Sequence, residues 1–270
     1  MGKQTGFLEY ERVENKEIPV KVRIQGYEEF HAYSSAETRR EQGARCMNCG
    51  VPFCQSAMKL SGMVVGCPLH NLIPEWNDCI YRGEDMHALA RLLKTNRFPE
   101  FTGRVCPALC EKACICGQYD NPVTVRDNEL YLIETAYKNG WMKSNIPARE
   151  SGRRVAVVGS GPSGLSCADA LRRRGHSVTV FEREDRIGGL LMYGIPNMKL
   201  DKSVIARRQK IMEEEGIVFR TGVNIGKDMS AETLRSEYDA VACAAAQNSR
   251  EPLRRKAWRE WTAFISLSIS

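Results

Sequence analysis

The distribution of cysteines constrains this chain more than any other feature. Nine of its eleven cysteines lie between residues 46 and 116, and eight of these nine form two groups. The first group has Cys-x2-Cys-x4-Cys spacing and, after twelve more residues, a Cys-Pro step; it comprises Cys46, Cys49, Cys54 and Cys67. The second has Cys-x3-Cys-x3-Cys-x-Cys spacing and comprises Cys106, Cys110, Cys114 and Cys116. Such spacings bring thiolates to one metal centre, and Cys-Pro steps recur where iron–sulfur clusters bind.

Three interpretations of these cysteines compete. Disulfides are the weakest, because the segment from Met1 to Glu17 is polar and resembles no secretory signal. Structural zinc is the serious alternative, since paired Cys-x2-Cys motifs make tetrahedral sites. Zinc requires two clean pairs, whereas the second group offers a triple spacing. We therefore predict two iron–sulfur clusters.

Composition excludes several other classes of protein. Of the 270 residues, 43% are hydrophobic and 27% charged, as in soluble globular proteins. No apolar run approaches the ~20 residues that cross a bilayer, so we expect a cytoplasmic protein. The net charge of +6 is partly due to the segment from Gln247 onward, which has five Lys/Arg against two Asp/Glu. A nucleic-acid partner is not expected, because no basic face with interleaved aromatics is visible elsewhere.

A mainly helical domain is predicted for residues 1–145. A helix should begin near Ser34, because Ser34 and Glu37 have capping-box spacing. Apolar periodicity predicts two further helices, over Asp85–Asn96 and Val125–Lys138, and Pro99 should close the region between them. Cysteine loops would connect these helices.

Other charged and imidazole side chains near the cysteines have open roles. Arg39, Arg40 and Arg45 belong to the first predicted helix, where either a solvated face or a role near the metal site is possible. The four histidines form no triad or metal pattern with one another. His70 stands next to Cys67-Pro68 and is the one candidate for a hydrogen-bond donor to cluster sulfur.

A nucleotide-binding domain is predicted for residues 152–243, after a linker over Ser144–Arg153. The strand Arg154–Val158 runs into the sequence GSGPSG, and a helix and a second strand, Ser177–Phe181, follow. In this order a G-x-G-x-x-G motif is a specific signal of dinucleotide binding. Its glycines permit a tight turn and the close approach of a pyrophosphate to a helix N-terminus.

The acid after the second strand selects the nucleotide. Glu182 can accept hydrogen bonds from a ribose, and its charge repels a 2′-phosphate, so the site suits FAD or NAD and not NADP. A glycine-rich stretch from Arg186 to Leu200 indicates backbone close to a ligand, with a plain surface loop as the alternative. The predicted cofactor-binding residues are Gly159, Ser160, Gly161, Pro162, Ser163, Gly164, Glu182, Arg183, Gly189 and Leu190.

Five motifs carry a resemblance to a known family. They are RCMNCGVPFC from Arg45, CPLHNLIPEW from Cys67, TGRVCP from Thr102, VVGSGPSGL from Val157 and GGLLMYGIP from Gly188. With them, residues 5–241 resemble the amino-terminal part of the small (beta) subunits of bacterial NADPH-dependent glutamate synthase. The same module occurs in dihydropyrimidine dehydrogenase and related NAD(P)H-dependent flavin and iron–sulfur oxidoreductases, which remain alternatives.

The resemblance implies an α + α/β fold: a helical domain with two [4Fe–4S] clusters, then a Rossmann-type FAD domain with a parallel sheet. It implies that one cluster is held by Cys46, Cys49, Cys54 and Cys114, and the other by Cys67, Cys106, Cys110 and Glu129. For Glu129 an ordinary exposed helix acid is the alternative. The remaining cysteines are expected to be small buried residues.

The chemistry implied by the resemblance is electron relay. In the family, NADPH reduces FAD by hydride transfer, and the clusters pass single electrons to a large (alpha) subunit. There glutamine-derived ammonia and 2-oxoglutarate become glutamate. No acid–base residue of this chain is expected to be catalytic, because the cofactors supply the chemistry. The alternative from another class is a non-enzymatic zinc-binding scaffold.

The chain departs from the family pattern after Val241. The Gly-rich step expected there is replaced by AAAQNS from Ala244, and residues 244–270 match no family motif. The family's NADPH domain and the segment that completes the FAD domain do not follow. We therefore expect a tail that results from a frame change, an exposed strand edge beside it, and no NADPH-dependent activity of this chain alone.

Overall fold

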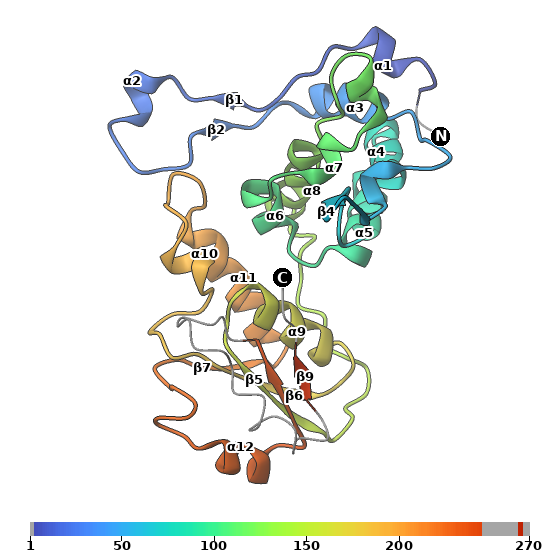
Figure 1. Ribbon diagram of the computed structural model, residues 1–270. Helices are drawn as coiled ribbons and strands as arrows, with labels where there is room; N and C mark the ends of the chain where they lie inside the picture. Colours follow the sequence, from blue (N-terminus) through green and yellow to red (C-terminus); the bar gives the residue numbers. More distant parts are fainter. Residues whose placement is uncertain (1–2, 245–263, 267–270) are drawn as a thin grey trace. The chain divides into compact units, whose positions relative to one another are not determined.

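The structure is a computed structural model that describes residues 3–244 and 264–266. The chain divides into two compact units, Met1–Met142 with Asn197–Leu200, and Lys143–Pro196 with Asp201–Ser270. The first unit is mainly helical and the second contains a parallel sheet (Figure 1). The predicted fold class is therefore confirmed. No helix in residues 3–244 is long and apolar enough to cross a membrane.

The first unit consists of short helices and two small antiparallel strand pairs. Its helices are α1 Gly6–Glu9, α2 Val20–Arg23, α3 Ala36–Ala44, α4 Ile73–Arg82, α5 Asp85–Thr95, α6 Pro99–Val105, α7 Leu109–Lys112 and α8 Val125–Lys138, with 3-10 turns η1 Phe53–Gln55 and η2 Ile115–Gln118. β1 (Lys16–Glu17) pairs with β2 (His31–Ala32), and β3 (Met58–Leu60) pairs with β4 (Met63–Val65). The two helices predicted after residue 80 appear as α5 and α8.

A hydrophobic core joins α4, α5 and α8. Trp76, Ile80 and Leu92 are fully buried in it. Five of the cysteines pack against this core from the connecting loops: Cys46, Cys54, Cys67, Cys110 and Cys114. The helices thus anchor loops that would otherwise have little structure of their own.

Two helix starts differ from the prediction. The side chain that caps α3 is Ser35, whose Oγ accepts a hydrogen bond from the Thr38 N–H at 3.2 Å. Ser34 instead accepts a hydrogen bond from Arg39 Nη2 at 3.0 Å. Pro99 begins α6 rather than closing the region, because the first turn of a helix does not need the N–H that proline lacks.

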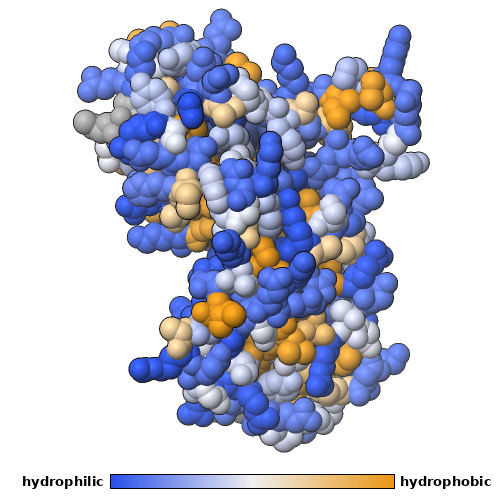
Figure 2. Space-filling model, turned by 180° about the vertical axis from the view of Figure 1, so that it is seen from behind, coloured by the Kyte–Doolittle hydropathy of each residue, from blue (hydrophilic) through white to orange (hydrophobic). Residues whose placement is uncertain are grey.

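The N-terminal arm, residues 13–33, carries exposed apolar side chains. It contains β1, α2 and β2. Val20 and Val22 are each 56% exposed and Ile24 is 73% exposed. These side chains account for the orange surface on the arm at the upper right of Figure 2. Charged side chains accompany them, among them Arg23, whose guanidinium lies 2.8 Å from the Glu17 carboxylate.

The second unit is a five-stranded sheet with helices between the strands. Its elements are β5 Arg154–Val158, α9 Pro162–Arg172, β6 Ser177–Phe181, α10 Leu190–Tyr193, α11 Lys202–Glu214, β7 Val218–Arg220, α12 Ala231–Glu237, β8 Ala240–Cys243 and β9 Phe264–Ser266. The strand order is β7-β6-β5-β8-β9 and all neighbouring strands are parallel. Residues 155–157 are a continuous buried run, as a parallel strand covered on both faces requires.

β9 corrects one expectation about the tail. The sequence shows no strand periodicity after Cys243, yet Phe264 pairs with Val241 and Ser266 with Cys243. The edge of β8 that was expected to be exposed is therefore covered by β9. The expected frame change otherwise concerns residues 245–263 and 267–270, which lie outside the described residues.

Candidate metal and nucleotide sites

The first predicted set of four cysteines converges on one hollow. Cys46 follows the end of α3, Cys49 lies in the next loop, Cys54 is in η1, and Cys114 caps η2. All four line the same hollow beside Ile73 of α4. They come from two segments that are far apart in the sequence, so the fold itself assembles the set.

The thiols of this set are close enough to affect one another. Burial is the main reason that the pKa of Cys46 is raised to about 12, and the neighbouring Cys114 and Cys49 contribute to the rise. Burial also raises the pKa of Cys54 to about 12, again with a contribution from the other three thiols. A bound cation reverses this preference, because a coordinating thiol is deprotonated. The donor set therefore fits a thiophilic metal centre.

Cys114 differs from the other three thiols. A hydrogen bond from the Cys116 thiol, opposed by burial, lowers the pKa of Cys114 to about 6, and backbone N–H groups act in the same direction. Cys116 itself is buried, and its Sγ also lies 3.5 Å from the carbonyl oxygen of Arg45, to which it can donate. Cys114 is thus the thiolate that forms most readily. The sequence analysis assigned Cys116 no role. Only the Cys-x-Cys spacing between Cys114 and Cys116 could have indicated that Cys116 donates a hydrogen bond to Cys114.

The second predicted set also comes together, from four different elements. Cys67 follows β4, Cys106 ends α6, Cys110 is in α7, and Glu129 is in α8. Burial raises the pKa of each thiol, and in all three the Glu129 carboxylate contributes to the rise, so that carboxylate lies within electrostatic range of the three thiols. The structure therefore assembles the cysteines with the one predicted ligand that is not a cysteine.

Glu129 is not the exposed helix acid that was its alternative interpretation. Its side chain is buried, and it accepts hydrogen bonds from Asn96 Nδ2 at 2.8 Å and from Thr102 Oγ1. Burial is the main reason that the pKa of Glu129 is raised to about 7; the carboxylates of Glu100 and Glu111 contribute to the rise, and the hydrogen bonds from Thr102 and Asn96 oppose it. A cation beside it would relieve this cost, so Glu129 fits a metal-ligating position.

A backbone contact ties the two sets together. The Cys67 N–H donates to the Cys54 carbonyl at 2.6 Å. Gly66 makes this contact possible, because a Cβ there would lie 2.2 Å from the Phe53 carbonyl oxygen.

His70, considered as a donor to cluster sulfur, is exposed, and its Nδ1 is 3.0 Å from the Gln55 carbonyl. His70 thus links the loop after Cys67 to Gln55.

Cys79 lies in a separate group of possible metal ligands. Its Sγ, a Glu84 carboxylate oxygen and a His87 ring nitrogen all lie within 4.8 Å of one another. Arg82 already supplies positive charge there, with Nη2 3.9 Å from Cys79 Sγ and 2.9 Å from the Asp78 carboxylate. We therefore assign no ion to this group.

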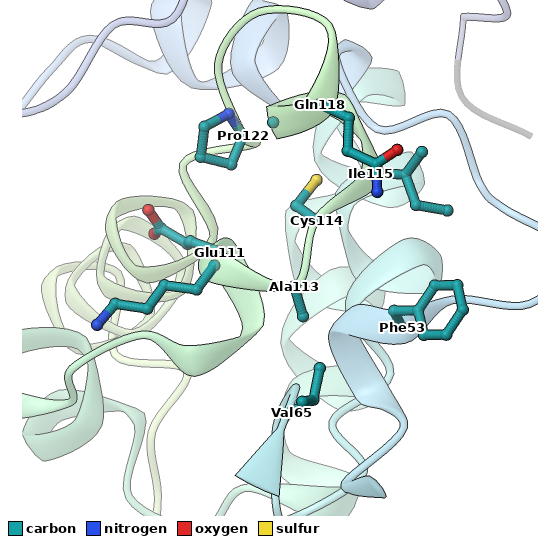
Figure 3. Close-up of a pocket in the computed structure, with 10 residues that line it drawn as sticks. Phe53, Val65, Glu111, Ala113, Cys114, Ile115, Gln118 and Pro122 are labelled. Carbon is teal, nitrogen blue, oxygen red and sulfur yellow. The ribbon is translucent and has the colours of Figure 1, made fainter. Parts of the chain in front are cut away.

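An open cavity of about 450 Å³ lies beside the first cysteine set. Phe53, Val65 and Pro122 line it together with residues 111–115, 117 and 118. Figure 3 shows Cys114 between Pro122 and Ile115, with its sulfur atom between these two side chains. Sequence reasoning did not predict this cavity, which brings solvent close to one of the four thiols.

The glycine motif of the second unit has the geometry that a pyrophosphate requires. A Cβ at Gly164 would lie 1.9 Å from the Gly159 carbonyl oxygen, so glycine is needed for the turn to pack on α9. A Cβ at Gly161, the N-cap of α9, would meet nothing within 4 Å. Open space at a helix N-terminus is where a phosphate binds. Pro162 and Ser163 form the first turn of this helix.

Glu182 is held against the glycine turn. Its carboxylate accepts hydrogen bonds from Ser160 N at 2.9 Å, Ser160 Oγ at 2.5 Å and Glu184 N at 3.1 Å. The second glycine pair lies beside the same turn, because Gly188 N donates to Ser160 O at 3.1 Å and a Cβ at Gly189 would be 3.0 Å from Gly161 Cα. These predicted residues therefore come together. The side chains of Arg183 and Leu190 are exposed, and the Arg183 guanidinium lies 3.1 Å from the Glu184 carboxylate.

Comparison with known proteins agrees with this arrangement. Residues 23–141 match the family described as dihydropyrimidine dehydrogenase domain II, 4Fe-4S cluster, and residues 157–203 match the NAD(P)-binding Rossmann-like domain. The chain is 51% identical over 254 residues to the glutamate synthase (NADPH) small chain of Bacillus subtilis, which covers 94% of this chain and 52% of that protein. The corresponding small chain of Mycobacterium tuberculosis H37Rv is 49% identical over 256 residues, covering 94% and 49%. The glutamate synthase (NADH) of Saccharomyces cerevisiae is 46% identical over 242 residues, covering 90% and 11%. The chain thus spans about half the length of the bacterial relatives.

Proposed function

Because 94% of the chain aligns at 51% identity with a glutamate synthase small chain, we propose that it belongs to that family and is the electron-transfer part of such an oxidoreductase. The observation that carries the proposal is the convergence of two separate ligand sets within the helical unit. Each set takes ligands from both cysteine groups, so the two sites form together when the unit folds.

We assign one [4Fe–4S] cluster to Cys46, Cys49, Cys54 and Cys114, and the other to Cys67, Cys106, Cys110 and Glu129. When bound, such clusters accept and release single electrons. The chain's own residues supply the thiolates and one carboxylate, and the core around Trp76 and Ile80 excludes water from one side.

For the second unit we propose FAD binding. When bound, FAD accepts a hydride and releases its electrons one at a time. Gly161 would leave room for the pyrophosphate, the N-terminus of α9 would supply favourable charge, and Glu182 would accept hydrogen bonds from the ribose. The predicted contacts through Arg183 and Leu190 belong to this proposal. The two cofactor domains would be residues 1–145 and 152–243.

The reaction of the whole enzyme follows from the family. We propose that electrons pass from NADPH through this subunit to a large subunit that makes glutamate from glutamine and 2-oxoglutarate. Dihydropyrimidine dehydrogenase shares the helical domain, as the match over residues 23–141 indicates, and is the second candidate. Identity of 51% to a glutamate synthase small chain favours the first.

Metal and partner analysis tests the proposal. Protein purified anaerobically should contain iron and acid-labile sulfide, show broad visible absorption that dithionite bleaches, and co-purify with a large amidotransferase subunit. About two zinc atoms per chain without sulfide would contradict the cluster assignment. Clusters without such a partner would contradict the assignment to glutamate synthase.

A further inference from the structure

A buried arginine stands immediately before the first cluster ligand. Arg45 ends α3, directly precedes Cys46, and is 1% exposed. Its guanidinium donates to the Tyr10 carbonyl and, at 2.6 Å, to the Asn121 carbonyl. Its Nε has no hydrogen-bond partner within residues 3–244. An arginine is rarely buried in this way without a partner for its charge.

The charge of Arg45 is poorly compensated by this chain. Among the described residues its one ion pair is with Asp120, at 3.6 Å, and the Asp120 side chain is 58% exposed. Arg104, another buried arginine of the same unit, has carboxylates of Glu29 and Glu134 at 2.6 and 2.8 Å. A buried cation is costly unless negative charge lies nearby. The buried charge of Arg45 therefore needs negative charge beyond that of the exposed Asp120 side chain.

The backbone of Arg45 lies beside the first cysteine site. The Arg45 carbonyl oxygen is 3.5 Å from Cys116 Sγ, and Cys116 lines the hollow together with the four ligands. Asn121, which the guanidinium holds, precedes Val123, another residue of that hollow. The guanidinium thus connects the two segments that carry Cys46 and Cys114.

We propose that Arg45 is the charge-compensating and positioning residue of the first cluster site. This inference rests on the proposed function, since it requires a cluster at the first set. Four thiolates make a bound cluster negative overall, and reduction adds one further negative charge. The buried positive charge of Arg45 favours the reduced form, and so raises the reduction potential of this cluster relative to a site without it.

A redox titration of the cluster-loaded protein tests this role. The variants are Arg45→Gln, which keeps hydrogen-bond donors but removes the charge, Arg45→Met, which removes both, and Arg45→Lys, which keeps the charge. Dithionite supplies the electrons and the reduced clusters are followed by electron paramagnetic resonance. Arg45→Gln and Arg45→Met should lower the equilibrium constant for reduction of one cluster at least tenfold, which is 59 mV for one electron. Arg45→Lys should change it much less.

Arg39→Met is the matched control. Arg39 is also fully buried on α3, but it lies seven residues before Cys46, and its guanidinium donates to Asn128 and to the Val13 carbonyl rather than to the segment that follows Cys114. This variant should lose stability without changing either potential. An Arg45→Gln protein that keeps both clusters at wild-type potentials would overturn the inference, even if Arg45→Met failed to fold. A wild-type protein without clusters would instead refute the proposed function.

Discussion

At the scale of single residues, Glu129 shows how the fold prepares a side chain for a metal. Its carboxylate lies in the protein interior, beside three thiols and two other acids, and no cation pairs with it within the described residues. Hydrogen bonds from Asn96 and Thr102 orient it. Burying the charged carboxylate costs free energy while no cation is bound beside it. A bound cation offsets this cost.

The metal-free protein should therefore lose stability as the pH rises. The folded-state pKa of Glu129 is about 7, above the ordinary value of 4.5, so the folded state binds the proton more tightly than the unfolded state. The stabilisation is complete below pH 4.5 and is lost as the pH approaches and passes 7, by at most about 3 kcal/mol.

Urea unfolding of metal-free protein at pH 5 and pH 8 measures this loss. Glu129→Gln, which cannot ionise, should show a smaller decrease than the wild type, and the difference between the two proteins isolates Glu129. Equal decreases in both proteins would show that Glu129 ionises normally.

Burial is what the sequence could not predict at this scale. The cysteine spacings and the family motifs selected residues that the fold brings together, and their assignment as cluster ligands stays a prediction. They could not decide whether the arginines of α3 were solvated. Arg40 is exposed, whereas Arg39 and Arg45 are fully buried, because the segments that cover them come from residues 10–13 and 121–128. Spacing along one helix contains no information about such distant segments.

At the scale of elements, the turn between β5 and α9 separates two roles of glycine. Gly164 is needed for packing, because its missing side chain leaves room for the Gly159 carbonyl. Gly161 faces open space and has a φ of −63°, which any residue adopts. One glycine therefore serves the fold and the other leaves room for a ligand.

Alanine substitutions should distinguish these roles. Gly164→Ala should lower the free energy of unfolding by about 1–3 kcal/mol, because the new Cβ overlaps a backbone atom. Gly161→Ala should leave it unchanged or raise it by up to about 1 kcal/mol, yet weaken FAD binding at least tenfold by filling the phosphate position. Denaturant unfolding and flavin fluorescence measure the two effects. Unchanged flavin affinity in Gly161→Ala would place the pyrophosphate elsewhere.

Elements were predictable where periodicity was long and regular. α8, β5 and β6 have the predicted limits, because their apolar patterns extend over whole elements. α4, α6 and α7 were not predicted, since they are short and lie among cysteines and prolines that look like loop. β9 has only three residues and depends on pairing with β8, which no local pattern encodes.

At the scale of the molecule, the two proposed cofactors belong to different compact units. All predicted cluster ligands lie in the first unit, and all predicted nucleotide contacts lie in the second. A change at one site should therefore leave the other cofactor in place.

Glu182→Ala should thus lower FAD content and leave the iron content unchanged. It removes the carboxylate proposed to bind the ribose, together with its contacts to Ser160 and Glu184. Glu232→Ala, at an exposed position of α12, is the control and should retain both cofactors. Flavin and iron are measured on the same preparation. Joint loss of flavin and iron from Glu182→Ala would show that the cofactor domains are not independent.

The most direct test is the number of iron atoms per chain in cysteine variants. Two [4Fe–4S] clusters give about eight iron atoms in the wild type. Cys49→Ala, in the first set, and Cys106→Ala, in the second, should each retain about four, with a matching loss of sulfide, and Cys243→Ala, outside both sets, should retain about eight. Iron content that is the same in all four proteins, or zinc in place of iron and sulfide, would contradict the assignment of two separate cluster sites.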